Sequence, residues 1–366
     1  MQANEFVVEK FIAKGKFSLV YEVTRNGNAN EGHKYALKRS FLKNKGTIIR
    51  ALQERKVLEK ISTAGGTNKS PFLPILSSAF WMGTSVAMVM TAGCGMDLSE
   101  LMLSHHPMSE SSARFYCAEI LCGIEYLHAL KIVHVDLKPE NVLITTSGHV
   151  MITDFDHCLD ISSGPSHHPE TIAGTVYYKA PEVANRQLID EKADIWSWAS
   201  ILVELIDDCV RDEELSRDKL NMLAKTGKVT MNHFKSYSYE LQDLVAACFN
   251  IYPRLRPGVS EVKMHPFFRT TDWNDVVACR IEPPIKLTVS DFRFAKTENH
   301  FKTSDPQILN NLYESEMINL DDEIQNSDGT YTYGKYEQDS EDPMNANLTE
   351  NDLRDLFADF NFENPQ

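Results

Sequence analysis

The chain has 366 residues, of which 42% are hydrophobic and 24% charged, so it is long enough for two lobes with a substantial buried core. The net charge of −15 is unevenly spread, because residues 270–366 hold 21 acidic and 7 basic residues while the rest is close to neutral. Nucleic acid and anionic membranes are polyanions and therefore poor partners for that acidic region. A solvated segment explains its charge as well as a partner-binding one does.

The seven cysteines indicate a reducing compartment, because they are odd in number and form no C-x-x-C pair in a large chain. Residues Met1–Glu5 lack the basic start and apolar core of a signal peptide. No apolar run approaches the roughly 18 residues that span a bilayer. We therefore expect a soluble cytoplasmic protein without a membrane span, with the nucleus as the alternative location.

The first part of the chain predicts a small antiparallel sheet followed by a helix. Residues 6–40 alternate short β-type runs with turn signals, and the third run contains Lys38. Residues 48–61 carry an apolar stripe at helical spacing, and Glu54 lies within this predicted helix. A snorkelling surface lysine and a solvated glutamate are the alternative interpretations of these two residues.

Two further strands fit residues 72–81 and 85–90, and glycines then interrupt the pattern at 91–95. Asp97 opens the next helix, where it is either an N-cap or an acid that faces a ligand. Residues 109–130 predict a long amphipathic helix whose aromatic and leucine stripe is core packing rather than a cofactor site.

The stretch 132–144 reads IVHVDLKPENVLI and places Asp136, Lys138 and Asn141 at i, i+2 and i+5. That spacing is too irregular for one face of a helix or strand. Apolar runs on both sides indicate a loop held rigidly between two buried segments, which can aim a carboxylate, an ammonium and an amide at one reacting centre. A buried turn with a chance Asp–Lys pair is the alternative.

A second acidic motif, Asp-Phe-Asp, begins at Asp154, 18 residues after Asp136. Its first carboxylate is the oxygen ligand that a hard cation such as Mg²⁺ prefers. Residues 174–182 read GTVYYKAPE, residues 194–199 read DIWSWA, and residues 265–268 read HPFF.

These motifs, in this order, resemble those of the eukaryotic serine/threonine protein kinases. The 132–144 loop is similar to the catalytic motif H-R-D-L-x-x-x-N, with Val135 in place of arginine. The acidic triplet resembles D-F-G, with Asp156 in place of glycine, and 174–182 resembles the end of an activation segment. Ten positions match the motifs of the family: Lys38, Glu54, Asp136, Lys138, Asn141, Asp154, Thr175, Glu182, Asp194 and Arg256.

Within the family the chain is similar to the AGC group, the cyclic-nucleotide-dependent kinases, protein kinase C and their relatives. Asp272-Trp273 and Pro283-Pro284 resemble the start of the C-terminal extension of that group, and residues 357–362 (FADFNF) resemble its closing hydrophobic motif. The resemblance implies that this motif docks on the small lobe through Phe357, Phe360 and Phe362. An amphipathic terminal helix that packs elsewhere is the alternative.

The implied fold is α+β and bilobal, with a small antiparallel β lobe that carries one main helix and a larger, mainly helical lobe. The expected boundaries are an N-terminal stub at 1–5, a kinase domain at 6–268 with small lobe 6–90, hinge 91–97 and large lobe 98–268, and an acidic extension at 269–366.

The resemblance implies ATP and Mg²⁺ as cofactors. Asp136 is expected to accept the proton of the attacking hydroxyl, and Lys138 to stabilise the transferring phosphate. Asn141 and Asp154 are expected to hold Mg²⁺.

Lys38, fixed by Glu54, is expected to hold the ATP phosphates. Of the three glycines of the usual phosphate-binding loop only Gly15 is present. The residues expected to surround the nucleotide are Ile12, Ala13, Gly15, Phe17, Ser18, Val20, Ala36, Lys38, Met90, Thr91, Gly93, Asp97 and Leu143.

Regulation is expected to depart from the family pattern at Val135, because valine cannot clasp a phosphate on the activation segment. Thr171 matches the phosphorylation site of that segment, and Thr175 follows it. We therefore expect activity to depend only weakly on phosphorylation of Thr171. Asn361 stands where many relatives carry a phosphorylated residue, which favours a docking motif that needs no phosphate.

The expected partners are protein substrates with basic residues upstream of the acceptor, selected by Glu140 and Asp97, and the chain is expected to be a monomer. A pseudokinase is the rival hypothesis, supported by the thinned glycine loop, Val135 and Asp156. An active enzyme is favoured because every residue with a direct chemical role is retained. Lys138 and the 174–182 motif disfavour a phosphotransferase that acts on small molecules.

Overall fold

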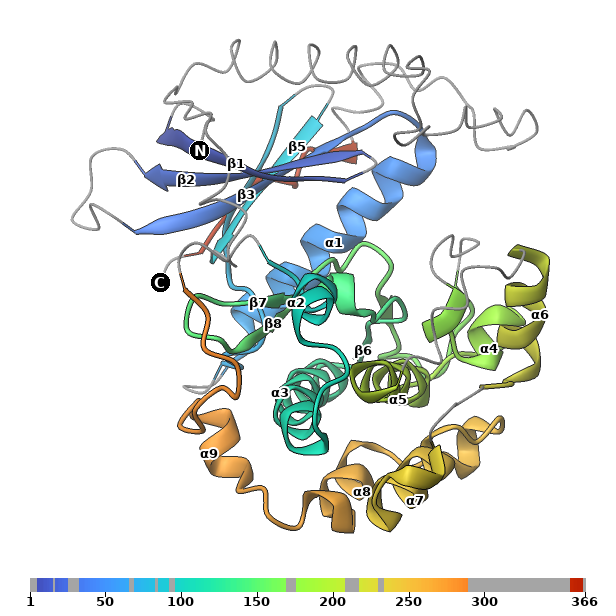
Figure 1. The fold of residues 1–366 in the computed structure, drawn as a ribbon. Coiled ribbons are helices and arrows are strands. Elements are labelled where there is room, and N and C mark those ends of the chain that lie inside the picture. Colours follow the sequence, from blue (N-terminus) through green and yellow to red (C-terminus); the bar gives the residue numbers. More distant parts are fainter. Residues whose placement is uncertain are drawn as a thin grey trace, which may run out of the picture. The chain divides into compact units, whose positions relative to one another are not determined.

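The computed structural model describes residues 5–15, 17–25, 33–65, 69–82, 85–91, 96–168, 176–207, 217–229, 234–288 and 356–364. The chain forms two compact units (Figure 1). The β unit comprises Met1–Arg55, Leu76–Ala92 and Lys296–Gln366, and the helical unit comprises Lys56–Ile75 and Gly93–Ala295. The predicted α+β class, with a small antiparallel β part and a larger helical part, is confirmed.

The β unit contains a sheet in the order β1-β2-β3-β5-β4-β10, in which every described pairing is antiparallel. The predicted three-stranded start of this sheet is therefore confirmed. The six strands are β1 (Phe6–Lys14), β2 (Ser18–Arg25), β3 (Lys34–Phe41), β4 (Leu76–Trp81), β5 (Ser85–Thr91) and β10 (Phe362–Glu363).

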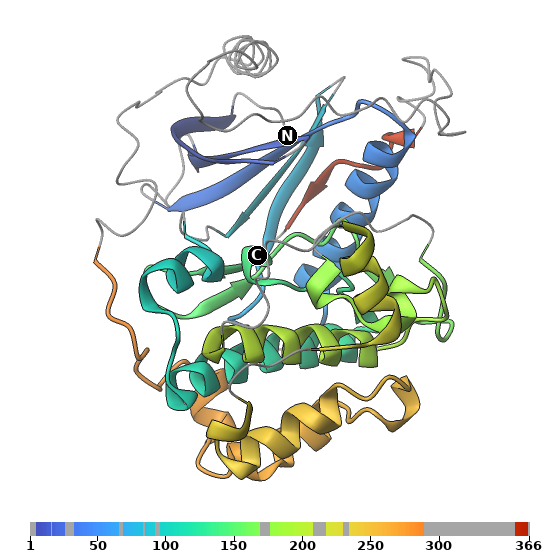
Figure 2. The same cartoon turned by 45° about the vertical axis from the view of Figure 1, so that its right-hand side comes forward.

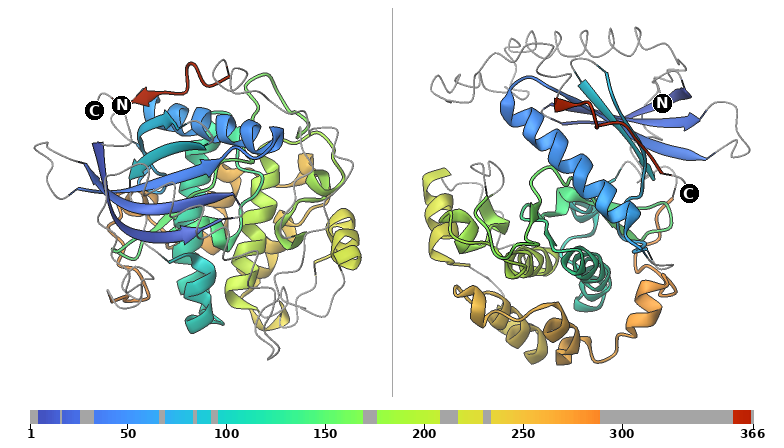
Figure 3. Two further views of the ribbon diagram at one scale, coloured as in Figure 1. Left: turned by 90° about the horizontal axis from the view of Figure 1, so that it is seen from above. Right: turned by 180° about the vertical axis from the view of Figure 1, so that it is seen from behind.

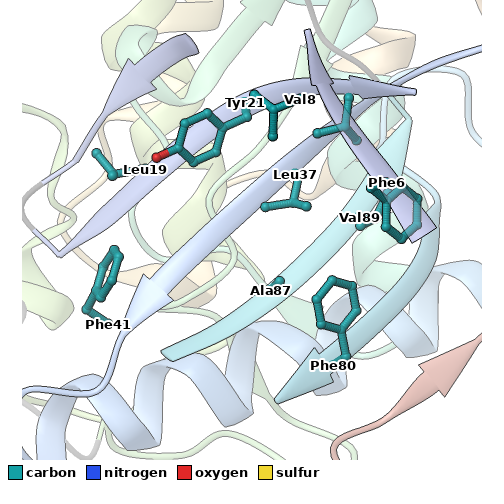
Figure 4. Packing of buried hydrophobic residues seen from close by; sticks show 10 residues of the cluster. Phe6, Val8, Leu19, Tyr21, Leu37, Phe41, Phe80, Ala87 and Val89 are labelled. Atoms are coloured by element: carbon teal, nitrogen blue, oxygen red, sulfur yellow. The ribbon is translucent and has the colours of Figure 1, made fainter. Parts of the chain in front are cut away.

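One face of this sheet carries a tightly buried apolar cluster (Figure 4). Side chains alternate between the two faces of a strand, so Leu37 points into the cluster while its neighbour Lys38 points to the opposite face. Phe6 stacks on Phe80 with ring centroids 6.1 Å apart. Each of these large side chains contributes about 1.5–3 kcal/mol of burial energy, which fixes the strand register and with it the direction of Lys38.

Helix α1 (Lys45–Thr63) follows β3 and extends slightly beyond the predicted limits at both ends. Its start is fixed by Asn44, whose side-chain oxygen accepts from the Thr47 amide at 2.9 Å. The helix runs through both units, because Arg55 is the last of its residues in the β unit and Lys56 the first in the helical unit. Figure 2 shows α1 as one uninterrupted helix.

The end of the described chain adds a strand to the sheet rather than a terminal helix. In β10, Phe362 pairs with Ala79 and Glu363 with Ser78, both on β4. Figure 3 shows this short strand in red next to β4. The preceding rings of Phe357 and Phe360 are each only 2% exposed. The amphipathic terminal helix that was the alternative to docking would fall largely on residues outside the described part.

The helical unit is centred on α3 (Glu110–Ala129) and α5 (Lys192–Ile206), which lie side by side. The indole of Trp198 donates to the Cys117 carbonyl at 2.9 Å and joins the two helices. The other helices of this unit are α2 (Leu98–His105), α4 (Pro181–Ala184), α6 (Arg217–Thr226), α7 (Tyr239–Cys248), α8 (Val259–Met264) and α9 (Trp273–Val277). None of the helices in the described ranges is long and apolar enough to cross a membrane.

Two short strand pairs in the helical unit frame the 132–144 loop. Strand β6 (Ile132–Val133) pairs with β9 (Leu159–Asp160), and β7 (Val142–Ile144) pairs with β8 (Val150–Ile152). The loop thus begins at the end of one ladder and finishes at the start of the next. The predicted position of the loop between two buried segments is confirmed, because both residues of β6 are buried and so are Val142 and Ile144 of β7.

A buried ion pair anchors the segment that follows the GTVYYKAPE motif. Arg256 donates to both oxygens of Glu182, at 2.7 and 3.1 Å, and neither residue exceeds 2% exposure. Arg256 also donates two hydrogen bonds to the Asn250 carbonyl and one to the Lys192 carbonyl, and these bonds use its remaining N–H groups. The expected pairing of Glu182 with Arg256 is therefore present, and the complete hydrogen bonding makes the buried charges tolerable.

Candidate active site

One group of candidate site residues lies in the β unit and consists of a lysine held by a glutamate. The ammonium of Lys38 donates to Glu54 Oε1 at 2.7 Å, where the two side chains are 16% and 4% exposed. Strand β3 presents the lysine on the face opposite the apolar cluster, and α1 presents the glutamate. Neither residue is the solvated surface group that was the alternative interpretation.

Other residues of the β unit that were expected to surround a nucleotide share this sheet face. Val20 pairs with Lys38, and Ala36 pairs with Met90, so all four occupy matching positions on adjacent strands. The hairpin between β1 and β2 closes through Gly15, whose amide donates to the Ser18 carbonyl at 2.8 Å. A Cβ atom at Gly15 would lie 2.6 Å from the Ser18 hydroxyl, which explains the glycine here.

Four further expected pocket residues of the β unit are only placed by their elements. Ile12 and Ala13 lie on β1 and are half-buried, as is Phe17 just before β2, while Thr91 ends β5 and is exposed. Gly93 lies outside the described residues.

Asp97 caps helix α2 and also lies next to the strand that follows the catalytic loop. Its carboxylate accepts from the Glu100 amide at 3.0 Å and the Ser99 hydroxyl at 2.6 Å, in a complete capping box. An isolated β-bridge joins Asp97 to Leu143. The N-cap role is thus shown, and the bridge brings together two expected nucleotide-binding residues of the helical unit.

A separate group of candidate site residues lies in the helical unit, on the loop that carries Asp136. The Lys138 ammonium donates to Asp136 Oδ2 at 2.6 Å, and the Asn141 amide donates to the Asp136 carbonyl at 2.8 Å. Asn141 also donates to Asp136 Oδ2 at 3.3 Å, so all three side chains converge although their spacing is irregular. A chance Asp–Lys pair does not explain such convergence.

The charges around Lys138 favour its ammonium form. Burial of this side chain lowers its pKa, but Asp136, Asp154 and Glu140 outweigh that effect and raise the pKa of Lys138 above its ordinary value. A permanently cationic group is therefore held beside the carboxylate of Asp136. The influence of Asp154 on Lys138 also shows that the two acidic motifs of the sequence face the same point.

Asp154 occupies a strained backbone conformation beside Asn141. Its φ of 67° lies in the left-handed region, which costs a non-glycine residue about 1–3 kcal/mol and is typical of functional sites. The Thr153 amide donates to the Asn141 carbonyl at 2.9 Å, and the Thr153 carbonyl lies 3.0 Å from His134 Nε2. The DFD segment is thus bound directly to the catalytic loop.

The residues at this point fit a magnesium ion. Because both hydrogen bonds of Asn141 use its Nδ2, its oxygen Oδ1 is turned away from Asp136 and can act as a ligand beside the Asp154 carboxylate. In the described part of the chain, no three histidine, cysteine, aspartate or glutamate side chains form a metal cage of their own. Mg²⁺ commonly uses one or two protein ligands and takes the others from phosphate and water.

Val135 is the most unusual residue of the loop, because it combines a β-branched side chain with a φ of 68°. Two hydrogen bonds impose this conformation: the amides of His134 and Val135 donate to the two oxygens of Asp194, each at 2.9 Å. The Val135 side chain is 2% exposed and packs in an apolar cluster with Leu159 and Ile161. The expectation that activity depends only weakly on phosphorylation of Thr171 stays a prediction, because Thr171 lies outside the described residues.

One charged residue near the loop was missed by the sequence analysis. Glu204 lies on α5, is 3% exposed, and accepts a short hydrogen bond from the Tyr178 hydroxyl. Burial, together with repulsion from Glu204 and Asp97, raises the pKa of Glu140 against the attraction of Lys138. A glutamate within the apolar run Leu202-Val203-Glu204-Leu205 was the signal that could have revealed it.

The activation-segment threonines Thr171 and Thr175 lie outside the described residues, so their expected roles stay predictions. The other predicted residues form two groups that are each internally consistent. Lys38 and Glu54 meet in the β unit, whereas Asp136, Lys138, Asn141 and Asp154 converge in the helical unit.

Comparison with known proteins agrees with this geometry. A family model described as the protein kinase domain matches residues 6–268. The chain is 31% identical over 297 residues to ribosomal protein S6 kinase alpha-2 of Mus musculus, which covers 78% of this chain and 39% of the relative. It is 31% identical over 298 residues to ribosomal protein S6 kinase alpha-1 of Homo sapiens, with the same coverage.

A third relative, ribosomal protein S6 kinase beta of Caenorhabditis elegans, is 30% identical over 300 residues, which is 79% of this chain and 52% of the relative. The chain thus spans about two fifths to one half of the length of these curated relatives.

Replacing Asp194 by asparagine should destabilise the fold, because an amide nitrogen would then face one of the backbone N–H donors. We expect Asp194→Asn to lose about 1.5–3 kcal/mol of unfolding free energy at pH 7, measured by urea denaturation. Asp243→Asn is the matched control, since Asp243 is 82% exposed and its replacement should cost less than about 0.5 kcal/mol.

The deficit of Asp194→Asn should also depend on pH. Burial raises the pKa of Asp194, but the hydrogen bonds from His128 and the His134 amide prevail, so the folded-state pKa is lowered. A lowered pKa gives stability above the unfolded value near pH 4 that is lost as the pH falls below it. A difference between wild type and variant that stays constant from pH 7 to pH 3 would contradict this assignment.

Proposed function

This chain belongs to the protein kinase family, and we propose that it transfers the γ-phosphate of Mg-ATP to serine and threonine hydroxyls of protein substrates. The observation that carries the proposal is the convergence of Asp136, Lys138 and Asn141 on one rigid loop. The resemblance to AGC-group serine/threonine kinases is confirmed by the comparisons.

The residues of the loop suit the two tasks of phosphoryl transfer, which are positioning and charge neutralisation. Asp136 accepts the proton of the substrate hydroxyl and orients its oxygen for attack. Lys138 donates to Asp136 in the structure and supplies positive charge where negative charge develops on the transferring group. Mg²⁺, when bound, would supply positive charge against the phosphate oxygens.

Asn141 and Asp154 are the residues that would hold the metal, and Lys38 is the residue that would hold the phosphates of ATP. Glu54 accepts a hydrogen bond from Lys38 at 2.7 Å and so orients its side chain, which is only 16% exposed. The pseudokinase alternative is weakened because each of these groups is present with the partner that its task requires. The departures at Val135 and Asp156 leave these side-chain contacts intact.

Protein substrates are favoured over small molecules by the anchored segment around Glu182. The printed names of the relatives describe kinases of a ribosomal protein, which also favours a macromolecular substrate class. Five cysteines in the described ranges are free thiols, which suits the expected cytoplasmic location. We further propose that the chain acts there as a monomer.

The assay that tests this function is transfer of labelled γ-phosphate from Mg-ATP to a generic protein substrate. We expect Asp136→Asn to lower kcat by about 10²–10⁴-fold, because the proton acceptor is removed. Lys38→Met should lower the rate by about 10²–10³-fold through lost charge stabilisation. Lys56→Met, an exposed lysine of the same helix as Glu54, is the control and should retain the wild-type rate.

Equal activity of wild type and Asp136→Asn would refute the catalytic assignment. A wild-type protein that binds ATP but transfers no phosphate would support the pseudokinase alternative instead.

We propose that the enzyme prefers basic residues upstream of the acceptor, through an acidic group formed by Glu140, Glu204 and Asp97. These carboxylates come from three elements of the helical unit, and burial, together with repulsion from Glu204 and Asp97, raises the pKa of Glu140. An arginine side chain relieves that repulsion, because its guanidinium donates to two carboxylates at once. Glu204 adds a buried charge to the pair that the sequence indicated.

A positional peptide library tests this preference. We expect wild-type protein to favour arginine upstream of the acceptor, and Glu204→Gln to reduce that preference by about tenfold or more, because a desolvated charge pair is lost. Glu191→Gln, at the other end of α5, is the control and should leave the selectivity unchanged. A wild-type library without basic selection would dispose of the idea.

We propose that the hydrophobic motif steadies the Lys38–Glu54 pair by docking beside α1. Phe357 stacks on Trp81 with ring centroids 6.4 Å apart, and the Arg55 guanidinium donates to the Phe360 carbonyl at 3.1 Å. Arg55 directly follows Glu54, so the motif contacts α1 next to the residue that orients Lys38.

The motif is secured without a phosphate group. Asn361 Oδ1 accepts from the Trp81 amide at 3.3 Å, which gives the side chain at the usual phosphorylation position a neutral partner. The amide of Asn364 donates to the Ser77 carbonyl at 2.9 Å, and Glu363 pairs with Arg25 at 3.0 Å. These contacts support a motif that is permanently docked.

Removal of one buried ring tests the docking role. We expect Phe360→Ala to lower kcat/KM about tenfold, because α1 loses a contact next to Glu54. Leu356→Ala is the matched control, since Leu356 is 47% exposed. Steady-state kinetics of folded Phe360→Ala at the wild-type level would show that the motif serves stability alone.

A further inference from the structure

Helix α1 makes a second charged contact, six residues after Glu54, that none of the motifs includes. The Lys60 ammonium lies 3.1 Å from Asp160 Oδ2 and 3.3 Å from the Ser162 hydroxyl. The side chains of Lys60 and Asp160 are 33% and 28% exposed, so the pair is partly shielded from water. Both residues belong to the helical unit.

The Asp160 carboxylate is also held by hydrogen bonds that do not involve Lys60. Its Oδ1 accepts from the Ser162 amide at 2.9 Å and from the Ser162 hydroxyl at 2.6 Å, in a tight local turn. Partial burial raises the pKa of Asp160, but the bonds from Ser162 and Lys60 prevail and lower it to about 2. The group is therefore a permanent, preoriented anion at neutral pH.

Asp160 stands on a strand that is hydrogen-bonded to the start of the catalytic loop. In the β6–β9 ladder it pairs with Ile132, and the next residue, Ile161, donates its amide to the Lys131 carbonyl at 2.9 Å. Strand β6 ends one residue before His134 and three before Asp136. The contact thus connects α1 with the strand pair that leads into the loop of Asp136.

The neighbouring position that carries a cation in the resembled motif is apolar in this chain. Val135 and Leu159 belong to one buried cluster, so this place offers no partner for an added phosphate. Lys60, by contrast, already has a built-in anion as its partner. The negative charge that binds Lys60 of α1 is therefore the carboxylate of Asp160, which needs no modification of the chain.

We propose that Lys60 and Asp160 are positioning residues that hold α1 in the register in which Glu54 meets Lys38, without any phosphorylation of the chain. The proposal rests on the proposed kinase function for its effect on rate. The two residues touch neither substrate nor nucleotide, and they act through Glu54 and Lys38.

The decisive experiment compares Lys60→Met, Asp160→Asn and the charge-swapped double variant Lys60→Asp/Asp160→Lys in the full chain. An ion pair of this exposure supports an effect of about threefold to tenfold, so we expect each single variant to lower kcat/KM for ATP by that factor. The KM for a peptide substrate should stay unchanged. The swapped pair should recover most of the loss, although a lysine in place of Asp160 cannot reproduce the bonds from Ser162.

Lys56→Met is the matched control, because Lys56 is exposed on the same helix. Hydrogen–deuterium exchange supplies a readout that does not need activity. We expect residues 48–56 of α1 to exchange faster in Lys60→Met than in Lys56→Met, since the helix loses its anchor.

The outcomes separate this proposal from the proposed function. The positioning role would be overturned if Lys60→Met showed wild-type kinetics and wild-type exchange. It would also be overturned if the charge-swapped double variant lost as much activity as the two single variants together. An inactive wild-type protein would refute the kinase function alone. In that case faster α1 exchange in Lys60→Met would still support the positioning contact, and unchanged exchange would overturn it.

Discussion

The buried carboxylate of Asp194 is the interaction on which the catalytic loop depends. It accepts the amides of His134 and Val135 and thereby holds a β-branched residue at a positive φ. Because that backbone turn sets the direction of the next residue, Asp136 reaches Lys138 and Asn141 only while Asp194 is in place. Helix α5, which carries Asp194, is buried along nearly its whole length, so the most rigid part of the helical unit supports its most strained part.

In the β unit, apolar packing rather than hydrogen bonding orients the candidate site residue Lys38. Its sheet uses strict alternation, with an apolar cluster on one face and Lys38 on the other. The cluster fixes strand register through many small packing contributions, whereas Asp194 acts through a few strong hydrogen bonds. Helix α1 belongs to both units, with the contacts of Glu54 and Arg55 in the β unit and that of Lys60 in the helical unit.

Much of the fold and of the site could be predicted because local patterns carried it. The strands, the long helices and the convergence of Asp136, Lys138 and Asn141 follow from periodicity, spacing and the resemblance to kinases. Glu204 was missed because its charge is interpretable only once Tyr178 and Glu140 lie beside it. Contacts such as Lys60 with Asp160 join residues 100 positions apart and have no sequence signature. Strand β10 was missed for the same reason, since a two-residue strand shows no alternation.

The pairing of β10 with β4 also covers an edge of the sheet. Without it, β4 would be an edge strand with backbone N–H and C=O groups open to another chain, next to vacated sites for two aromatic rings. Residues 362–364 therefore cover backbone groups of β4 that could otherwise pair with another chain. The new edge is short, and Glu363 and Asn364 make it polar. The segment that contacts α1 thus also covers part of a sheet edge that could otherwise pair with another chain.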